Sequence, residues 1–406
     1  MAETVQISEL GAQGDGVTDA GLFIAGALPG ETVRASVAGH RAALIEIVQR
    51  SASRVEPICP HFGTCGGCTL QHAADDFLAD WKRDLVARAL AARAIECVDI
   101  APTLTSPPAS RRRAVFSGRR TKKGTLVGFH APQSNQLIEI GQCPVVRQQI
   151  VDSLEILHEL VALGGSRKGE VRFTVTDSEA GLDIAATGGK ELDGGLYGRL
   201  VAATATTDIA RLTWDGEPVI QRDPPRQTMG RAQVVPPPGG FLQATVEGEA
   251  ALVAAVRRGI GQLRRVADLF AGCGTFTLPL AEEAEVTAFE ADVDALAALD
   301  AGWRQAEGLK RVETRPRDLF ARPLLAREFA DFDAAVLDPP RQGARAQCEH
   351  LAAVDLQALV MVSCNPATFA RDVRILVDGG WRLDWVQPID QFRWTPHVEL
   401  AAGLSR

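Results

Sequence analysis

The sequence predicts a multidomain α+β and α/β protein with a small N-terminal β-barrel, a central mostly antiparallel domain and a C-terminal doubly wound domain. The chain has 406 residues, which is too long for one ordinary domain. Short strands separated by glycine turns fill its first part, whereas regular strand–helix alternation begins after Phe241. We place the three predicted domains at residues 1–55, 56–235 and 236–406.

The N-terminal segment alternates short apolar runs with turns. Gly21-Leu-Phe-Ile and Ala43-Leu-Ile-Glu-Ile-Val are typical of β-strands, and the run from Gly11 to Gly16 is typical of a turn. Strands this short and this closely spaced predict a small closed barrel.

The central segment begins with a cysteine-rich loop at residues 59–68. An amphipathic helix follows, because Phe77, Trp81 and Leu85 recur every fourth residue and share one helix face. From about residue 105 to 235, alternating apolar and polar residues predict a largely antiparallel arrangement of strands.

The C-terminal segment follows the proline-rich run at 235–240 and reads as strands with helices between them. This alternation predicts a doubly wound, mostly parallel sheet. The predicted strands are 266–270, 285–290, 311–315, 334–338 and 359–363.

Charge is unevenly distributed along the chain. The net charge is −8 at pH 7, yet residues 101–150 carry eight basic residues and a single acid, Glu139. A local basic stripe is what phosphate binding requires, because only the contacting face must neutralise phosphates. A solvated basic β-ribbon explains the same charges equally well. The eight are Arg111, Arg112, Arg113, Arg119, Arg120, Lys122, Lys123 and Arg147.

The cysteines and the apolar runs bear on the compartment. No stretch reaches the roughly 18 uninterrupted apolar residues of a membrane helix, and no secretory signal is visible, so we expect a cytoplasmic protein without membrane contact. In a reducing cytosol, cysteines are metal ligands, catalytic thiols or buried small residues. The eight are Cys59, Cys65, Cys68, Cys97, Cys143, Cys273, Cys348 and Cys364.

A metal site is predicted at the cysteine loop. Cys59, Cys65 and Cys68 bring three thiols together, and Cys143 is a candidate fourth ligand. Four thiolates suit a [4Fe–4S] cluster or a zinc ion. The Cys-x2-Cys pair alone slightly favours zinc, whereas the asymmetric spacing and the distant fourth ligand differ from usual zinc ribbons. No redox partner or substrate is visible near these residues, so we expect a structural role.

A nucleotide site is predicted where the first C-terminal strand turns into a helix. Gly272 and Gly274 allow close backbone approach to a ligand, and Glu290 ends the second strand, where an acid can bind a ribose hydroxyl pair. No third glycine follows at the dinucleotide spacing, which favours S-adenosylmethionine over NAD. Asp318 and Asp338 follow the third and fourth strands. The alternative is a tight βα turn with a surface acid.

Two residues suit a covalent methylation of a pyrimidine ring. Cys364, in Ser-Cys-Asn-Pro, follows the fifth strand, and Glu399 lies in Thr-Pro-His-Val-Glu near the last strand. Carbon 5 becomes nucleophilic when a thiolate adds to carbon 6, and a base must then remove its proton. Partial burial would raise the pKa of such an acid toward that of a useful base. The simpler alternatives are a buried cysteine at a strand end and an acid on an edge strand.

Jointly, these motifs resemble the RNA uracil-5-methyltransferase family, iron–sulfur enzymes that make 5-methyluridine in ribosomal and transfer RNA. The resemblance covers nearly the whole chain. It implies a TRAM domain, an OB-like RNA-binding barrel, over 1–55, and a Rossmann-like class I methyltransferase domain over 236–406. Besides the cysteines, the matching motifs are Phe241-Leu-Gln243, Asp268-Leu-Phe-Ala-Gly-Cys-Gly, Asp338-Pro-Pro-Arg, Ser363-Cys-Asn-Pro and His397-Val-Glu399.

The resemblance also implies the role of each site residue. Cys364 adds to carbon 6 of the uracil, Glu399 removes the carbon 5 proton, and Cys59, Cys65, Cys68 and Cys143 hold a [4Fe–4S] cluster rather than zinc. Thr275 departs from the asparagine of relatives, and Asp318 stands where some members carry asparagine. The positions that line the donor and uracil site are Gln243, Phe270, Thr275, Glu290, Asp318 and Asp338.

The RNA target stays open among several alternatives. TRAM-bearing members often act on large ribosomal RNA, so we expect a monomer that binds structured RNA, with 23S rRNA favoured over tRNA. A cytosine-5 RNA methyltransferase uses the same thiolate chemistry, but Ser-Cys-Asn-Pro with a late His-x-Glu fits uracil better. A non-catalytic RNA-binding protein is opposed by the intact Cys364 and Glu399.

Overall fold

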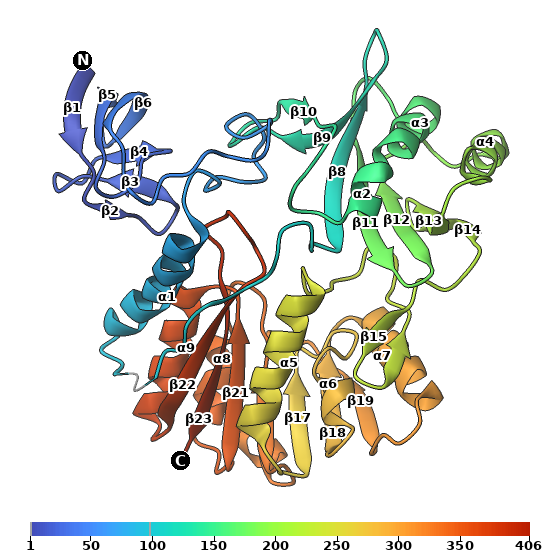
Figure 1. The fold of residues 1–406 in the computed structure, drawn as a ribbon. Helices are drawn as coiled ribbons and strands as arrows, with labels where there is room; N and C mark the ends of the chain where they lie inside the picture. Colours follow the sequence, from blue (N-terminus) through green and yellow to red (C-terminus); the bar gives the residue numbers. More distant parts are fainter. Residues whose placement is uncertain (1, 97–98) are drawn as a thin grey trace.

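The computed structural model describes residues 2–96 and 99–406, in which sheets of six, seven and eight strands and one two-stranded sheet are present. Figure 1 shows the N-terminal and central sheets above the C-terminal sheet with its helices. Cys97 lies outside the described residues. Within them, no helix combines the length and apolar character needed to cross a membrane.

The N-terminal sheet contains short strands: β1 (Ala2–Gln6), β2 (Glu9–Leu10), β3 (Asp15–Val17), β4 (Phe23–Ala25), β5 (Thr32–Ala38) and β6 (Arg41–Gln49). Their order is β1-β5-β6-β4-β3-β2. The other four strands form a sheet whose outer strands are β5 and β3. The segment 2–10 hydrogen-bonds to both of them, since β1 pairs with β5 and β2 with β3. Between them, the Ile7 N–H donates to the Glu31 carbonyl and the Ser8 N–H to the Val17 carbonyl, both at 2.9 Å.

The central sheet has seven strands and three helices beside it. It comprises β8 (Arg113–Arg120), β9 (Thr125–His130), β10 (Leu137–Glu139), α2 (Gln148–Asp152), α3 (Leu154–Gly164), β11 (Val171–Ser178), β12 (Gly181–Thr187), α4 (Gly194–Thr204), β13 (Ile209–Trp214) and β14 (Glu217–Gln221). The pairings are antiparallel, as alternation predicted, except for the parallel pair β12–β13. Phe116, Phe173 and Trp214 are fully buried in its core.

The predicted amphipathic helix is α1 (Asp75–Ala91). Trp81 is buried in it, whereas Phe77 and Leu85 are half-buried. The Trp81 indole N–H donates to the Leu10 carbonyl at 3.0 Å, so the helix packs on the N-terminal sheet. Its other side packs on the C-terminal sheet and its helices, and α1 therefore joins two of the three predicted domains (Figure 1).

The C-terminal sheet has the order β19-β18-β17-β20-β21-β23-β22-β7. Its strands are β7 (Leu104–Thr105), β17 (Arg265–Leu269), β18 (Glu285–Glu290), β19 (Val312–Pro316), β20 (Ala334–Leu337), β21 (Ala358–Ser363), β22 (Arg382–Asp390) and β23 (Glu399–Ser405). The five predicted strands are confirmed to within one residue at each end, and they are mutually parallel. β23 runs antiparallel between β21 and β22.

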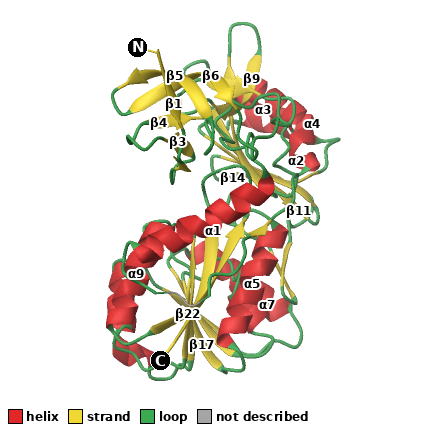
Figure 2. Ribbon diagram, turned by 60° about the vertical axis from the view of Figure 1, so that its left-hand side comes forward, coloured by secondary structure: helices red, strands yellow, loops and turns green. Residues whose placement is uncertain are grey.

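Helices cover both faces of this sheet, as a doubly wound fold requires. Figure 2 shows α9 on one side of the strands and α5 with α7 on the other. The remaining elements are α5 (Val246–Ile260), α6 (Thr277–Leu280), α7 (Val293–Gln305), the 3₁₀ helix η1 (Ala326–Phe329), α8 (Arg345–Leu351), α9 (Pro366–Asp378) and the hairpin of β15 (Gln227–Met229) with β16 (Ala232–Val234). The strand order reverses between β17 and β20, where sheets of this kind bind their ligands.

Candidate active site

The candidate active site lies beyond the carboxyl ends of the C-terminal strands. Phe270, Asp338 and Cys364 directly follow β17, β20 and β21, and Glu290 is the last residue of β18. Because these strands are parallel and adjacent, their register gathers four of the predicted site residues at one edge of the sheet.

The turn after β17 has an uncommon backbone. Gly272 and Gly274 adopt φ angles of 55° and 99°, and Phe270 adopts a φ of 66° although it is not glycine. A Cβ on Gly274 would lie 2.9 Å from the Leu299 side chain, so a larger residue does not fit without a shift. Positive φ in a bulky residue costs on the order of 1–3 kcal/mol and clusters at functional sites. The turn is therefore held in a shape that local preferences disfavour.

Glu290 ties this turn to the end of β18. Its carboxylate accepts the Gly272 N–H at 3.0 Å, and also the N–H groups of Ala291 (2.7 Å) and Asp292 (2.9 Å). One carboxylate oxygen thus contacts the glycine turn, where the sequence predicts a ribose, and the other holds the backbone that follows β18.

Asp318 organises the loop after β19. Its carboxylate accepts the N–H groups of Phe320 (2.9 Å) and Ala321 (3.1 Å). The Phe320 ring packs on the Phe270 ring, with 5.2 Å between centroids. This contact joins the loop after β19 to the turn after β17. Thr275 lies half-buried within the glycine turn.

Buried acids accumulate at this edge. Asp268 is fully buried and accepts the Thr277 hydroxyl at 2.5 Å, and burial raises its pKa to about 7. Burial also raises the pKa of Asp338 well above its usual range, and the carboxylates of Glu399, Asp268 and Glu290 add to that rise. Asp268 begins the glycine motif but was not assigned to the site from the sequence.

Glu399 lies close enough to Cys364 to influence the titration of its thiol. Burial raises the pKa of the Cys364 thiol to about 11, the carboxylates of Glu399 and Asp338 add to this rise, and Arg341 opposes it. Glu399 is 6% exposed, and burial raises its pKa to about 7 against a hydrogen bond from Gln391. The structure therefore brings the predicted nucleophile and the predicted base together.

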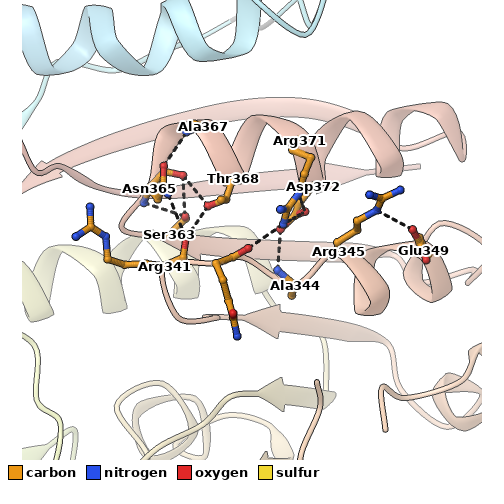
Figure 3. A network of polar contacts seen from close by, with 11 residues as sticks. Arg341, Ala344, Arg345, Glu349, Ser363, Asn365, Ala367, Thr368, Arg371 and Asp372 are labelled. Atoms are coloured by element: carbon orange, nitrogen blue, oxygen red, sulfur yellow. Dashed lines mark hydrogen bonds and ion pairs between the residues drawn. The ribbon is translucent and has the colours of Figure 1, made fainter. Parts of the chain in front are cut away.

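The turn that carries Cys364 is held by its neighbours (Figure 3). The Asn365 side chain accepts the Ala367 N–H at 3.1 Å and donates to the Arg341 carbonyl at 3.2 Å. The Thr368 hydroxyl donates to the same carbonyl at 3.1 Å. Pro366 occupies the first turn of α9, where a missing N–H costs nothing. These contacts fix the start of α9 and hence the position of the thiol.

A cavity of about 350 Å³ opens beside Cys364. Gln13 from the N-terminal sheet, Arg88 from α1, Arg341 and His397 contribute to its walls. Arg341 belongs to the Asp-Pro-Pro-Arg motif and could have been found from it. No sequence signal marks Gln13 or Arg88, because only the packing of α1 brings them here.

Gln243 is buried behind this edge. It is 2% exposed, and its side-chain oxygen accepts a hydrogen bond from the Gln391 amide at 2.6 Å. Gln391 was not singled out from the sequence, although it lies in the loop just before the His-Val-Glu motif.

The four predicted cluster ligands line a second cavity, of about 270 Å³, between the cysteine loop and the central sheet. Arg111 lines it as well, and the Gly67 N–H donates to the Cys65 sulfur at 3.4 Å. In the described part of the chain, no three His, Cys, Asp or Glu side chains are placed to hold one metal ion. The thiols, which are gathered but not in a coordination geometry, are those of Cys59, Cys65, Cys68 and Cys143.

In the arginine run at 111–113, Arg112 is not part of a solvent-facing basic stripe, which corrects one interpretation of the charge pattern, whereas Arg111 and Arg113 are half-buried. Arg112 is 2% exposed and forms an ion pair with Glu249 of α5. It also donates to the Gln243 carbonyl at 3.0 Å. A charge in this environment is compensated by the protein itself and is not available to a phosphate.

The neighbours of Arg112 are also engaged inside the protein. Arg113 donates to the Gly239 carbonyl at 3.0 Å, and Arg111 faces the cysteine cavity. Lys122 and Lys123, in contrast, are exposed at the turn between β8 and β9. The surface cations of this segment thus lie at a hairpin tip, away from the arginine run.

Comparison with known proteins identifies the family of this chain. The model of the tRNA (Uracil-5-)-methyltransferase family matches residues 306–406. An uncharacterized RNA methyltransferase of Brucella suis is 44% identical over 405 residues, which cover 99% of this chain and 97% of that protein. The 23S rRNA (uracil(1939)-C(5))-methyltransferase RlmD of Aeromonas hydrophila is 32% identical over 95% of this chain and 91% of its own length. The chain belongs to the RNA uracil-5-methyltransferase family.

Solved structures agree on the fold. The Pyrococcus abyssi tRNA (uracil-54, C5)-methyltransferase, determined with S-adenosyl-L-homocysteine, superposes with a TM-score of 0.78 over 99% of both chains at 24% identity. The overall fold of this RNA uracil-5-methyltransferase is therefore shared with that enzyme.

Proposed function

We propose that this protein methylates carbon 5 of uridine in RNA, with S-adenosylmethionine as the methyl donor. The observation that carries the proposal is the meeting of Cys364 and Glu399 at the carboxyl edge that also bears the glycine turn. A thiol nucleophile, a buried carboxyl base and a nucleotide-type turn are the parts that carbon 5 methylation needs.

In the proposed reaction, the Cys364 thiolate forms a bond to carbon 6 of the uracil, and the ring electrons move toward carbon 5. Carbon 5 then takes the methyl group of S-adenosylmethionine, whose sulfur keeps the electron pair of the broken sulfur–methyl bond and leaves as S-adenosylhomocysteine. Glu399 then accepts the proton from carbon 5, the double bond re-forms, and the sulfur–carbon 6 bond breaks. A carboxyl pKa near 7 suits this base, because the group is partly ionised at neutral pH yet basic enough to accept a proton.

The proposed donor and uracil site extends over the residues expected from the family motifs. Glu290 and Asp318 present carboxylates at the ends of neighbouring strands, and Phe270 with its strained backbone offers an apolar surface beside them. The complete proposed set is Gln243, Phe270, Thr275, Glu290, Asp318 and Asp338.

Ribosomal RNA is the proposed substrate, and tRNA is the alternative. The Aeromonas relative acts on 23S rRNA and is 32% identical over nearly the whole chain, whereas the archaeal tRNA enzyme is 24% identical. We propose that residues 1–55 form the TRAM-like OB barrel that binds this RNA, since segment 2–10 pairs with both sheet edges and Gln13 reaches the Cys364 cavity. The enzyme would act in the cytoplasm as a monomer.

A [4Fe–4S] cluster is proposed for the cysteine cavity. Its walls bring four thiols together, and a backbone N–H already points at one of the sulfurs, as is common around such clusters. The cluster would tie the cysteine loop to the central sheet. Iron and acid-labile sulfide near four atoms each per anaerobically purified chain would support it, whereas zinc without iron would refute it.

The proposed function is tested by methylation of defined transcripts. We expect radiolabelled methyl transfer to 23S rRNA fragments and 5-methyluridine in the digested product. A tRNA transcript, and fragments in which the modified uridine is replaced by cytidine, serve as comparisons. Transfer to tRNA alone would favour the alternative substrate, and 5-methylcytidine as the product would overturn the assignment to uracil.

A further inference from the structure

The side chain of Gln391 is held in one orientation by the backbone. It is 2% exposed, and its oxygen accepts the N–H groups of Ala244 at 2.8 Å and Thr245 at 3.4 Å. Because a carbonyl oxygen only accepts and an amide nitrogen only donates, these two groups decide which end of the side chain faces them. The NH₂ end must point the other way.

The NH₂ end of Gln391 faces two site residues. It donates to the Gln243 side-chain oxygen at 2.6 Å. Gln391 also lies two residues beyond Ile389, the register partner of Glu399 in the β22–β23 pair, and its amide lowers the pKa of the Glu399 carboxyl group. The side chains of Gln243, Gln391 and Glu399 are all buried.

Gln391 therefore also decides how Gln243 is oriented. The Gln243 oxygen is occupied by Gln391, so the Gln243 amide is left with its nitrogen for other partners. No hydrogen bond from that nitrogen occurs within the described residues. Rotating the Gln243 amide by half a turn would set two NH₂ groups against each other, which neither can satisfy.

The other groups around Glu399 either respond to its charge or favour its ionised form. The acid of Asp338 and the thiol of Cys364 are close enough for the Glu399 charge to act on both. The Arg341 guanidinium favours the ionised carboxylate, as does the Gln391 amide. Of the two favourable groups, Arg341 is exposed and screened by water, whereas Gln391 is buried.

We propose that Gln391 is a positioning residue that holds the carboxyl group of Glu399 in place and fixes the amide orientation of Gln243. The inference rests on the proposed function, in which Glu399 is the base. Gln391 acts through these two side chains and not on the substrate itself, so its removal should alter proton transfer more than donor binding.

The deciding variant is Gln391→Glu. A carboxylate in this position still accepts the N–H groups of Ala244 and Thr245, so the local backbone keeps its partners. When ionised it cannot donate to Glu399, and it adds a like charge beside it. We expect the acid limb of the pH–kcat profile to move up by at least about one pH unit, the size of shift that a nearby like charge produces. The KM for S-adenosylmethionine should change less than twofold.

Gln387→Glu is the matched control, because it adds the same charge four residues earlier on β22. The Gln387 amide is half-buried and donates to the Pro102 carbonyl at 2.8 Å. The acid limb of the pH–kcat profile of Gln387→Glu should stay at the wild-type position. A second variant, Gln391→Met, removes the polar group without adding charge and should shift the limb in the same direction but less.

The possible outcomes distinguish a failure of the positioning role of Gln391 from a failure of the proposed function. An acid limb that stays in place in Gln391→Glu, with wild-type activity on uridine, overturns the positioning role but leaves the proposed function standing. Wild-type protein without transfer to uridine overturns the proposed function itself. If Gln391→Glu is inactive although folded, a trapped methylated RNA–protein adduct on a denaturing gel supports the role, and the absence of that adduct overturns it.

Discussion

The carboxyl edge of the C-terminal sheet and the cysteine cavity both gather buried ionisable groups, but they surround them differently. At the sheet edge, burial raises the pKa values of Asp338, Glu399 and Cys364, and the Glu399 carboxylate adds to the rise at the other two. In the cysteine cavity, burial raises the pKa of Cys143, and the backbone N–H groups of Val145 and Val146 oppose this rise, with a smaller contribution from Arg111. The first environment suits proton transfer, whereas the second suits a charged ligand set held in place.

The largest expected effect comes from the thiol at the sheet edge. Cys364→Ala should abolish methyl transfer and any covalent RNA adduct, because no other thiol and no hydroxyl group lines the cavity among the described residues. Transfer of labelled methyl groups and denaturing gels measure the two effects. Retained activity in this variant would contradict the covalent mechanism, while its iron content should equal that of the wild type.

Thiol replacement in the cysteine cavity should have the opposite pattern. Cys68→Ser is expected to lower iron content and thermal stability, because a ligand that bridges the loop and the central sheet is lost. Metal analysis and thermal unfolding of anaerobic samples measure this. A variant with full iron and unchanged unfolding temperature would show that Cys68 is not a ligand.

Replacing a buried cation of the basic segment should affect stability, whereas replacing an exposed one should affect RNA binding. Arg112→Ala leaves Glu249 buried without its partner and should cost about 3–5 kcal/mol in the free energy of unfolding. Lys122→Ala at the exposed hairpin tip should leave stability unchanged and reduce the salt dependence of RNA binding. Denaturant titrations and binding at several salt concentrations measure both. Equal effects of the two variants on stability would contradict the structural distinction.

A change of pH should alter the rates less than these substitutions do, and it should reflect the titration of both Glu399 and Cys364. The Glu399 pKa of about 7 is raised above its usual value, so the ionised base is lost as pH falls through 7, and turnover should decline there. The Cys364 pKa of about 11 means that the thiolate fraction, and hence the rate of adduct formation, should grow about tenfold per pH unit from neutral pH upward. Rapid-quench measurements across pH separate the two steps. A rate of adduct formation that is flat above pH 7 would show that the thiol is activated in another way.

Sequence reasoning predicted the strand–helix part best, because motif residues at the ends of adjacent parallel strands must meet at one edge. Glu290, Asp338 and Cys364 could be placed together from spacing alone. The arginine run could not be interpreted in this way, since the burial of Arg112 depends on Glu249, which lies far away in the sequence. Gln391 was missed for the same reason, because its role depends on backbone groups of Ala244 and Thr245 that no local pattern reveals.

The most direct test of the central claim is the fate of RNA in the Glu399→Gln variant. Glutamine keeps the size of the side chain but cannot accept the carbon 5 proton, so attack and methyl transfer should proceed while release of Cys364 fails. We predict that a methylated RNA–protein adduct accumulates and survives denaturing gel electrophoresis, in amounts absent from the wild type and from Cys364→Ala. Turnover at the wild-type rate in Glu399→Gln, without a trapped adduct, would contradict the assignment of Glu399 as the base.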